Sequence, residues 1–565
     1  MMSFRRFLHV KTVPKLYCNN VDTLKYSSSI PTHELLTKLN FVNHPKSGLV
    51  HWSPLGLTMV NKISDIIRQR MDEIDFEELS LSLLSHNSVW RKSGRWDHSS
   101  ELFKLKGEEY LLVPTAEEEI VTYVTNNITS YKNLPLLYYQ INPKFRNEKR
   151  PRGGLLRGKE FVMKDAYSFD SNEENAMKTY HNVVGAYVKI FEDLRLPYTK
   201  AEADSGDIGG SLSHEWHYID ETGEDTVYTC DSCGSVSNVE KTLSYPESTD
   251  ENIPIEVSVR YFTTEDKSTL ICAYYPTERN LEPKFVKNEV PDLDLDEVDQ
   301  DKILKEFSNE DTLISKKIIR IMDSRLHSRA NFPDFPITFI NRSLITTFTD
   351  IPIVSAVENE ICGKCEEGQL HSQRAIEIGH TFFLGDKYTK PLECSIDFPV
   401  NDKGQVERRN LIMGCYGIGV SRIIASIAEI NKDSKGLNWP QIVAPWTVTV
   451  VEAKESKDFA KFYAELNQNA VDYRLDNRPK VGLGKKIYQS ALVGIPLVVI
   501  LGKKYPIIEI EVRGKRYSDN LAWKELYESK DFEWKYDTDE QGNDIKHYVH
   551  QDGFVQVIKA LLKDM

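Results

Sequence analysis

The chain has 565 residues, a formal net charge of −14 at pH 7 and eight cysteines. This length predicts about three or four domains, and no apolar run reaches the roughly 18 residues that a membrane-spanning helix needs. The acidic total excludes a nonspecific nucleic-acid coat, so RNA would have to bind at local basic patches. The few cysteines exclude a secreted disulfide scaffold, and we expect reduced thiols.

Residues 1–25 have the composition of a targeting segment. Four basic residues, Arg5, Arg6, Lys11 and Lys15, are interleaved with apolar residues, and no acid occurs before Asp22. This pattern predicts a mitochondrial transit segment outside the fold. A basic N-terminus of a cytosolic protein is the alternative.

The stretch after Gly48 predicts a turn followed by an amphipathic helix. Its apolar residues recur at helical spacing and form one stripe toward a core: Leu57, Val60, Ile63, Ile67 and Met71. Further on, Thr115 and Glu117 stand at the start of a second expected helix, where a hydroxyl cap and acidic residues are ordinary.

The segment from Pro143 to Asp170 reads as a strand, a basic loop and a returning strand. From Lys144 to Lys164 it has eight Lys or Arg against two acids, and the loop glycines let backbone approach a ligand closely. Because side chains alternate along a strand, we expect Arg146 and Glu148 to share one face, with Phe161 on a face of the returning strand. The pattern predicts a cationic cradle that also offers an aromatic surface.

Two further stretches contain residue types found in known catalytic or nucleotide-binding motifs, but the residues do not have the spacing that those motifs require. Residues 206–219 contain Ser213, His214 and Glu215, but adjacent residues on a strand cannot form a hydrolase triad. Residues 414–430 contain Gly417 and Gly419, but Arg422 replaces the third glycine of a dinucleotide-binding fingerprint. We expect a strand in the first stretch and a strand followed by a helix in the second.

Two Cys-x-x-Cys pairs enclose an insertion, residues 241–357. Each pair has the spacing with which thiolates share a tetrahedral Zn²⁺, and four free thiols are the alternative. Within the insertion, residues 289–301 have seven acids and no base, which predicts a solvated linker. From Trp439 onward, alternating strands and helices predict a separate small α/β domain with a mostly buried sheet.

The loop sequence FRNEKRPRGGLLRGKEFVMKDAYSFD, residues 145–170, resembles the second signature motif of class II aminoacyl-tRNA synthetases. Its form is that of prolyl-tRNA synthetases of the bacterial and organellar type. The stretch after Gly48 resembles the first motif, with Ser82 where the family has proline, and GCYGIGVSRIIASIAEI resembles the third. The DNR and GLGKKI segments after residue 475 resemble the anticodon-binding domain of class IIa enzymes.

The resemblance implies an α+β catalytic domain, with an antiparallel sheet and flanking helices, over residues 26–240 and 358–438. It implies a degenerate editing-type domain at 241–357 and an α/β anticodon-binding domain at 439–565. The helix of the first motif forms the dimer interface in the family, so a homodimer is implied.

The resemblance also implies roles for individual residues. Arg146 and Arg422 would be catalytic through their contacts with the ATP phosphates, and the set implied for ATP comprises Arg146, Glu148, Arg157, Phe161 and Arg422. The set implied for proline comprises Thr115, Glu117, His214, Trp216 and Cys415. The set implied for tRNA comprises Arg150, Arg152, Lys485 and Lys486. From their spacing, the candidate zinc ligands are Cys230, Cys233, Cys362 and Cys365. The family more often has His at Ala116 and Gln at Phe383.

The implied activity is ligation of L-proline to tRNA(Pro) through a prolyl-adenylate, with ATP and Mg²⁺, in the mitochondrial matrix. The alternatives are a cytoplasmic location, another class IIa synthetase such as one for threonine, and a silent RNA-binding paralogue. Bacterial relatives use a Gly-x-x-x-Pro loop and a lysine in the insert to hydrolyse alanyl-tRNA. Residues 235–362 contain no glycine, although Lys284 or Lys287 would correspond to that lysine, so we expect no editing.

Overall fold

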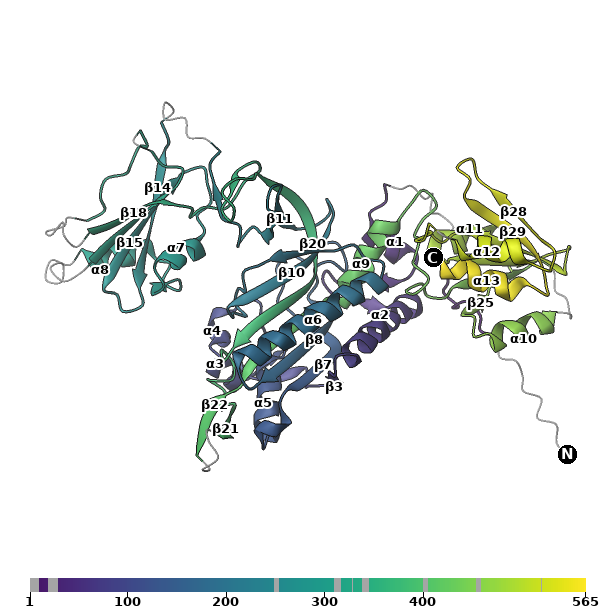
Figure 1. Cartoon of the computed structure of the whole chain (residues 1–565), viewed down its shortest axis with the longest axis horizontal. Coiled ribbons are helices and arrows are strands. Elements are labelled where there is room, and N and C mark those ends of the chain that lie inside the picture. The colour runs from purple at the N-terminus through teal and green to yellow at the C-terminus, as the bar shows by residue number, and fades with distance from the viewer. Residues whose placement is uncertain are drawn as a thin grey trace. The chain divides into compact units, whose positions relative to one another are not determined.

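The computed structural model describes residues 10–18, 29–247, 254–308, 317–327, 329–337, 345–399, 405–453, 459–519 and 521–565. The chain divides into two compact units (Figure 1). Unit 1 comprises Met1–Pro197, Gly209–Ser211 and Thr381–Met565, and unit 2 comprises Tyr198–Ile208 and Leu212–His380. Of the helices in these described ranges, none has the length and apolar character needed to cross a bilayer.

The centre of unit 1 is a sheet built around the expected strand pair. Strand β8 pairs antiparallel with β7 on one side and with β23 on the other, and β3 adds to β7 in parallel. The bounds are β3 (Glu77–Glu78), β7 (Leu136–Phe145), β8 (Glu160–Asp170) and β23 (Ile412–Ile418). The register places Cys415 opposite Tyr167, and Lys144 opposite Phe161. Residues from the second and third motifs thereby become neighbours.

Long helices pack on this sheet. They are α2 (Pro54–Asp72), α5 (Glu117–Asn127), α6 (Glu173–Asp193) and α9 (Val420–Asn431). Pro54 at the first position of α2 fits a helix start, because its missing N–H would be unpaired there. Helix α6 is capped by Asn172, whose side chain accepts a hydrogen bond from the backbone N–H of Asn175, and the helix lies along β8 (Figure 1).

Shorter elements complete the N-terminal part of unit 1. They are α1 (Thr32–Lys38), β1 (Val42–Asn43), β2 (His51–Trp52), β4 (Leu84–His86), α3 (Asn87–Lys92), α4 (Arg95–His98), β5 (Phe103–Lys104), β6 (Tyr110–Leu112) and the 3₁₀ turn η1 (Tyr131–Asn133). A hairpin, β21 (Ser395–Pro399) and β22 (Val406–Asn410), precedes β23.

Two details of the expected strand and helix faces are wrong. Strand β7 ends at Phe145, so Arg146 and Glu148 lie in the loop and not on a strand face. On α2, the side chains of Val60, Ile63, Ile67 and Met71 are buried as expected, but Leu57 is 48% exposed.

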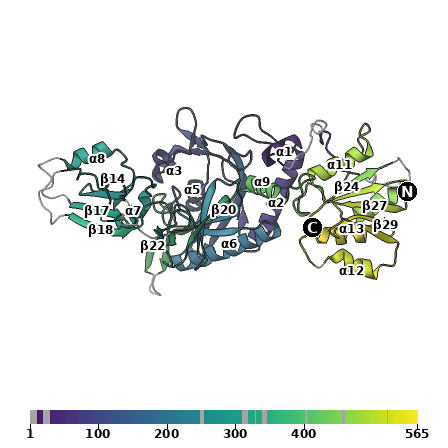
Figure 2. The same ribbon diagram turned by 90° about the horizontal axis from the view of Figure 1, so that it is seen from above.

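The C-terminal part of unit 1 is a six-stranded sheet with helices on both faces (Figure 2). The expected elements are present: β24 (Val448–Glu452), α10 (Ala460–Gln468), β25 (Tyr473–Leu475), α11 (Leu483–Val493), β26 (Leu497–Leu501) and β27 (Ile507–Val512). The chain adds α12 (Ala522–Ser529), β28 (Trp534–Thr538), β29 (Asp544–His550) and α13 (Phe554–Lys563). Apolar residues of α10 and α13 cover one face, and Ile487 of α11 packs on the other.

Residues 10–18 form part of this C-terminal fold. Edge strand β25 gains a partner, because Leu475 donates to the carbonyl of Lys11 at 2.9 Å and accepts from Val13 at 3.0 Å. Tyr17 is fully buried, with its ring 5.5 Å from that of Trp446.

The expectation that all of residues 1–25 lie outside the fold is therefore wrong for residues 10–18. Residues 1–9 and 19–25 fall outside the described part of the chain.

Unit 2 begins with strands that lead into the insertion. They are β9 (Thr199–Glu202), β10 (Leu212–Ile219), β11 (Asp225–Cys230), β12 (Val236–Asn238) and β13 (Ser244–Tyr245), and the chain returns through β19 (Ile361–Cys362) and β20 (Leu370–Gly385), whose last residues belong to unit 1. β11 pairs antiparallel with β20, and β13 with β19.

The insertion folds as a five-stranded sheet with one helix on each face. Its elements are β14 (Val257–Thr264), β15 (Thr269–Pro276), α7 (Pro283–Glu289), β16 (Leu293–Asp294), α8 (Gln300–Phe307), β17 (Lys317–Asp323) and β18 (Ile345–Ile351). Residues 289–301 were expected to be a solvated linker, and this is wrong. Leu293 is fully buried in β16, and the Asp299 carboxylate caps α8.

Candidate active site

The first part of the candidate site is an arginine beside an aromatic ring. The guanidinium of Arg146 lies 5.1 Å from the ring centre of Phe161, and its Nε lies 3.9 Å from a carboxylate oxygen of Glu101. Among the residues that the structure describes, Arg146 Nε is buried without a hydrogen-bond partner. A buried guanidinium donor of this kind suits an anionic ligand, and phosphate matches its geometry.

Within the loop between β7 and β8, the carboxylate of Glu148 bonds to two other residues of the loop. The Glu148 carboxylate accepts hydrogen bonds from the backbone N–H of Arg150 at 2.8 Å and from Arg157 Nε at 2.5 Å. Partial burial raises the pKa of Glu148, but these hydrogen bonds outweigh it and hold the pKa below its usual value. Glu148 is therefore charged, and it joins the two sides of the loop.

The third-motif helix contacts the same hairpin. Arg422 Nε donates to the carbonyl of Leu156 at 2.9 Å, and the Ser421 hydroxyl accepts from the backbone N–H of Val162 at 2.8 Å. The structure therefore brings Arg422 to the loop that carries Arg146 and Arg157.

A second group of residues is centred on Arg95. Its Nη1 lies 3.1 Å from Glu117 Oε2, and its Nη2 donates to Thr115 Oγ1 at 3.2 Å. Cys415 Sγ contacts the other oxygen of Glu117 at 3.1 Å. Three of the predicted proline-binding residues, Thr115, Glu117 and Cys415, therefore form one buried cluster.

This cluster contains two buried carboxylates but one guanidinium. Burial raises the pKa of Glu117, but Arg95 and the neighbouring hydrogen bonds hold it below its usual value. Burial and the nearby charge of Glu117 raise the pKa of Glu118, although Arg95 lies 3.3 Å away. Glu117 is thus the ionised member of the pair, and a carboxylate in this setting suits a cationic ammonium.

A chain of hydrogen bonds connects Asp165 to the segment that carries Thr115 and Glu117. Its carboxylate accepts from the Tyr167 hydroxyl at 2.7 Å and contacts Lys144 Nζ at 2.6 Å. Tyr167 in turn accepts from the backbone N–H of Ala116 at 2.8 Å, which fixes the segment between Thr115 and Glu117. Burial lowers the pKa of nearby Lys164 to about 7.

The remaining two proline-pocket candidates, His214 and Trp216, belong to β10 in unit 2. Trp216 is fully buried, with its ring 5.2 Å from that of Tyr198. Ser213 donates to the carbonyl of Ala203 at 3.0 Å.

The opposite face of β10 carries a small group of acids and imidazoles. Glu215 lies 2.8 Å from His217, and His380 Nδ1 lies 3.3 Å from Glu377. Glu215, Glu377 and His380 each place one ligand atom within 4.8 Å of the others, so these residues could hold a metal ion that takes carboxylate and imidazole ligands.

The residues predicted to bind tRNA differ in exposure. Arg150 and Lys485 are exposed, whereas Lys486 is 8% exposed and donates to the backbone carbonyl of Asp476 at 2.7 Å. The structure therefore does not support Lys486 as a phosphate contact.

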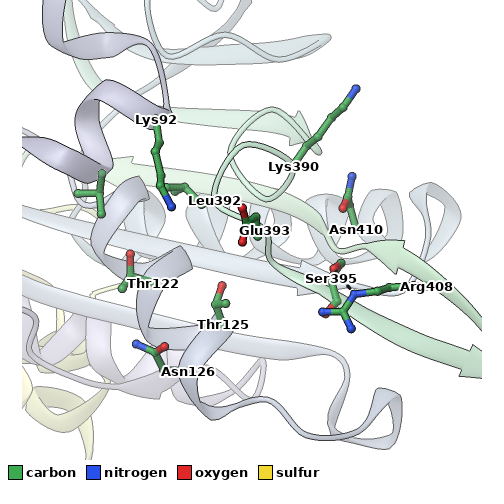
Figure 3. Close-up of a pocket in the computed structure, with 11 residues that line it drawn as sticks. Lys92, Thr122, Thr125, Asn126, Lys390, Leu392, Glu393, Ser395, Arg408 and Asn410 are labelled. Carbon is green, nitrogen blue, oxygen red and sulfur yellow. Dashed lines mark hydrogen bonds between the residues drawn. The ribbon is translucent and has the colours of Figure 1, made fainter.

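An open groove of about 680 Å³ lies elsewhere on unit 1, with α3 and α5 on one side and residues 390–395 and strand β22 on the other (Figure 3). Lys92, Thr125, Arg408 and Asn410 are among the residues that line it, and none of the predicted site residues does.

Arg95 and Asp165 are the functional candidates that sequence reasoning missed. The Ser-Gly-Arg-Trp segment around Arg95 has no spacing that signals its role, because its partners follow about 20 residues later. Asp165 carried a weak signal, since it shares a strand face with Phe161 and Tyr167.

Comparison with known proteins identifies the family. The family model described as the tRNA synthetase class II core domain (G, H, P, S and T) matches residues 102–431. The cytoplasmic proline–tRNA ligase of Candida albicans is 62% identical over the full length of both chains. The probable mitochondrial proline–tRNA ligase of Saccharomyces cerevisiae is 44% identical, covering 98% of this chain and 97% of its own.

A crystal structure of prolyl-tRNA synthetase from Cryptosporidium parvum, complexed with L-proline and AMP, is similar in fold. Its TM-score is 0.56 at 13% sequence identity, and the match covers 99% of this chain and 78% of that one. The predicted α+β catalytic fold is confirmed, and the identities to the yeast enzymes exclude the threonyl alternative. The chain therefore belongs to the proline–tRNA ligases, a family of class II aminoacyl-tRNA synthetases.

Proposed function

We propose that the chain joins L-proline to tRNA(Pro) in two steps within the domains expected from the sequence. A carboxylate oxygen of proline first attacks the α-phosphorus of ATP, which forms prolyl-adenylate and releases pyrophosphate. A terminal ribose hydroxyl of the tRNA then attacks the prolyl carbonyl, and AMP leaves. The observation that carries this proposal is the pairing, within one unit, of the Arg146–Phe161 surface with the buried Thr115–Glu117 cluster.

On the nucleotide side, Arg146 holds the α-phosphate and stabilises the charge that spreads over it in the transition state. Phe161 stacks on the adenine, and Glu148 and Arg157 fix the loop that covers it. Arg422 reaches the γ-phosphate. Mg²⁺ bound together with ATP would neutralise part of the phosphate charge, and Arg146 and Arg422 would hold the phosphates beside it.

On the amino-acid side, the ionised Glu117 binds the secondary ammonium of proline, and Thr115 accepts one of its hydrogens. Cys415 closes the pocket beside the pyrrolidine ring. His214 and Trp216, the other two residues implied for proline, belong to unit 2, and their role stays a prediction. Catalysis requires no covalent enzyme intermediate, because holding the proline carboxylate next to the α-phosphate of ATP accelerates adenylate formation.

The proposed tRNA contacts are Arg150 and Arg152 at the acceptor end and Lys485 at the anticodon end. We also propose a homodimer through the first-motif helix, where Leu57 is 48% exposed. An exposed leucine on such a helix suits the self-complementary patch of a two-fold interface. Sedimentation equilibrium of the purified chain tests this assembly.

We propose the mitochondrial matrix as the location of the enzyme. Two observations support this proposal: the N-terminus is basic and free of acids, and the 44% identical yeast relative is named as a probable mitochondrial enzyme. The 62% identical relative bears the name of a cytoplasmic enzyme, which supports the alternative. Removal at residue 25 would take away the contacts of Tyr17, so any processing would fall before Val10. Import of the chain into isolated mitochondria, followed by N-terminal sequencing, separates the two locations.

The test of the nucleotide side is Arg146→Ala. Loss of the phosphate contact is expected to lower proline-dependent exchange of pyrophosphate into ATP about 100-fold or more, with no change in folding. Lys149→Ala, which removes an exposed cation from the same loop, is the matched control and should keep the exchange rate. A silent RNA-binding paralogue would show no exchange in the unmodified protein.

A further inference from the structure

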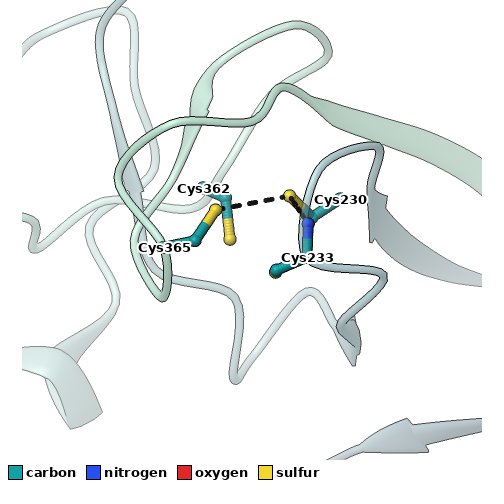
Figure 4. Close-up of side chains that lie close together, drawn as sticks. All are labelled: Cys230, Cys233, Cys362 and Cys365. Atoms are coloured by element: carbon teal, nitrogen blue, oxygen red, sulfur yellow. Dashed lines mark hydrogen bonds between the residues drawn. The ribbon is translucent and has the colours of Figure 1, made fainter.

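Four cysteines from the two ends of the insertion meet at one point in unit 2. Cys230 ends β11 and Cys362 ends β19, and Cys233 and Cys365 follow each by three residues. Their sulfur atoms all lie within 4.8 Å of one another (Figure 4). All eight cysteines of the chain lie among the residues that the structure describes, and none of them forms a disulfide there.

The sulfur separations fit a shared metal better than a disulfide. A tetrahedral Zn²⁺ with Zn–S bonds of about 2.3 Å requires sulfur atoms about 3.8 Å apart. Cys230 Sγ and Cys365 Sγ, one from each pair, are 3.6 Å apart. A disulfide requires about 2.05 Å.

The backbone around the cysteines is arranged as in metal-binding knuckles. The N–H groups of Cys233, Lys364 and Gly368 point at the sulfurs of Cys230, Cys362 and Cys365, at 3.5, 3.4 and 3.5 Å. Such donors stabilise the negative charge of coordinated thiolates, and they orient the ligands.

Gly368 allows the two cysteine turns, which we call knuckles, to lie close together. The first knuckle contains Cys230 and Cys233, and the second contains Cys362 and Cys365. A Cβ at this position would lie 2.5 Å from Cys230 Sγ and 2.5 Å from the Cβ of Ser232. Any larger residue would push the second knuckle away from the first. Gly234, which follows Cys233, has a φ of +66°, a conformation that favours glycine.

We propose that Cys230, Cys233, Cys362 and Cys365 bind one Zn²⁺ as a closed tetrahedral site. Four sulfur ligands leave no position for substrate, so the site is structural and separate from aminoacylation. Each thiol releases its proton on binding. Soft thiolates from four cysteines exclude Mg²⁺ and Ca²⁺, which take oxygen ligands.

The site fastens the base of the insertion. Cys362 pairs in register with Ser244, which joins the returning chain to the departing one. Two residues earlier, the Glu360 carboxylate accepts hydrogen bonds from Arg325 at 2.9 Å and from Arg279 at 2.7 Å, and Ser244 donates to it at 2.8 Å. Residues 231–247 lead into the insertion and β19 leads back from it, and we call these two segments the stalk. The metal and the ionic cluster would therefore fasten the stalk at two adjacent positions.

Elemental analysis of the full chain, purified without chelators, tests the proposal. We expect on the order of one zinc per chain, and loss of that zinc in Cys230→Ser and in Cys362→Ser. Cys394→Ala, a buried cysteine outside the cluster, is the control and should keep the metal. Protein containing no zinc, or zinc that both cluster variants retain, would overturn the proposal.

Cobalt substitution gives a second readout that does not depend on how the variants fold. Wild-type protein stripped of zinc and given Co²⁺ should show the intense visible absorption of tetrahedral thiolate cobalt. Zinc removal should also speed proteolytic cleavage of the stalk at residues 231–247 while the exchange activity of unit 1 persists. An octahedral cobalt spectrum, or tight binding of iron in preference to zinc, contradicts the assignment.

Discussion

At the scale of single residues, Arg95 organises the amino-acid side of the site. Its side chain is 8% exposed and reaches Thr115, Glu117 and Glu118, and its guanidinium lies 4.8 Å from the ring centre of Trp90. A planar fork can hold a hydroxyl and a carboxylate at fixed positions, which a lysine ammonium cannot do. Arg95 is therefore a positioning residue for the groups that meet the proline ammonium.

We expect Arg95→Lys to raise the KM for proline by about 10- to 100-fold, the equivalent of one lost charge-assisted hydrogen bond. The KM for ATP should stay unchanged, because the nucleotide contacts are made by other side chains. Pyrophosphate exchange at varied proline and ATP concentrations measures both values. Arg91→Lys, at a half-exposed arginine on α3, is the control. Equal rises in both KM values would show a general loss of structure instead.

The residue scale is where the sequence predicted least. Thr115, Glu117 and Cys415 were assigned through the family resemblance, and the structure brings them together. The partners of Arg95 could not be predicted, because they depend on how α4 packs against the start of α5. Lys486 was misassigned for a similar reason, since burial of one of two adjacent lysines is decided by tertiary packing.

At the scale of elements, the sequence predicted most of the catalytic and C-terminal parts. The returning strand after residue 150 and the strand and helix at residues 414–430 were placed correctly, since apolar periodicity defines them. The acidic stretch at 289–301 was misread, because its charged residues surround Leu293, whose burial depends on the sheet of the insertion.

The N-terminal segment 10–18, which we call the clasp, was also misjudged. Its basic composition resembled a leader, but Tyr17 and Cys18 are buried on the C-terminal domain. Arg478 lies 5.0 Å from the Tyr17 ring centre and donates to the Tyr17 carbonyl at 3.1 Å. Burial raises the pKa of the Cys18 thiol to about 12, so this thiol stays protonated and unreactive in the folded protein.

We expect Tyr17→Ala to lower the free energy of unfolding of the full chain by about 3 to 5 kcal/mol, the usual cost of deleting a buried aromatic ring. Leu16→Ala is the matched control, because the adjacent side chain is 64% exposed and its loss should cost about 0.5 kcal/mol or less. Urea unfolding followed by tryptophan fluorescence measures both. Similar effects of the two substitutions would show that the Tyr17 side chain is not buried against the C-terminal domain.

At the scale of the whole molecule, we expect the insertion to decide whether the enzyme corrects its errors, because the family resemblance implies an editing-type domain there. Alanine is smaller than proline, and a hydrophobic pocket rejects a smaller side chain weakly. A correcting site would need backbone turns around the terminal adenosine, and no glycine occurs at residues 235–362 to form them. Both faces of the insertion sheet are filled by apolar clusters that include Phe285 and Phe307.

The two candidate lysines of the insertion are already engaged. Lys284 Nζ lies 2.5 Å from a carboxylate oxygen of Asp204 and 2.8 Å from one of Glu240. Lys287 donates to the carbonyl of Leu293 at 2.9 Å. If Lys284 moved to a substrate, Asp204 and Glu240 would lose their partner, and if Lys287 moved, the Leu293 carbonyl would lose its donor. Each loss costs free energy that contacts with the substrate would have to offset.

We therefore expect the full enzyme to leave alanyl-tRNA(Pro) intact. Deacylation should proceed at the spontaneous rate, and Lys284→Ala should not change it. An editing enzyme added to the same alanyl-tRNA serves as the positive control and shows that the substrate can be hydrolysed. Hydrolysis well above the spontaneous rate that Lys284→Ala abolishes would contradict this expectation, because the lysine would then have to leave Asp204 and Glu240 during the reaction.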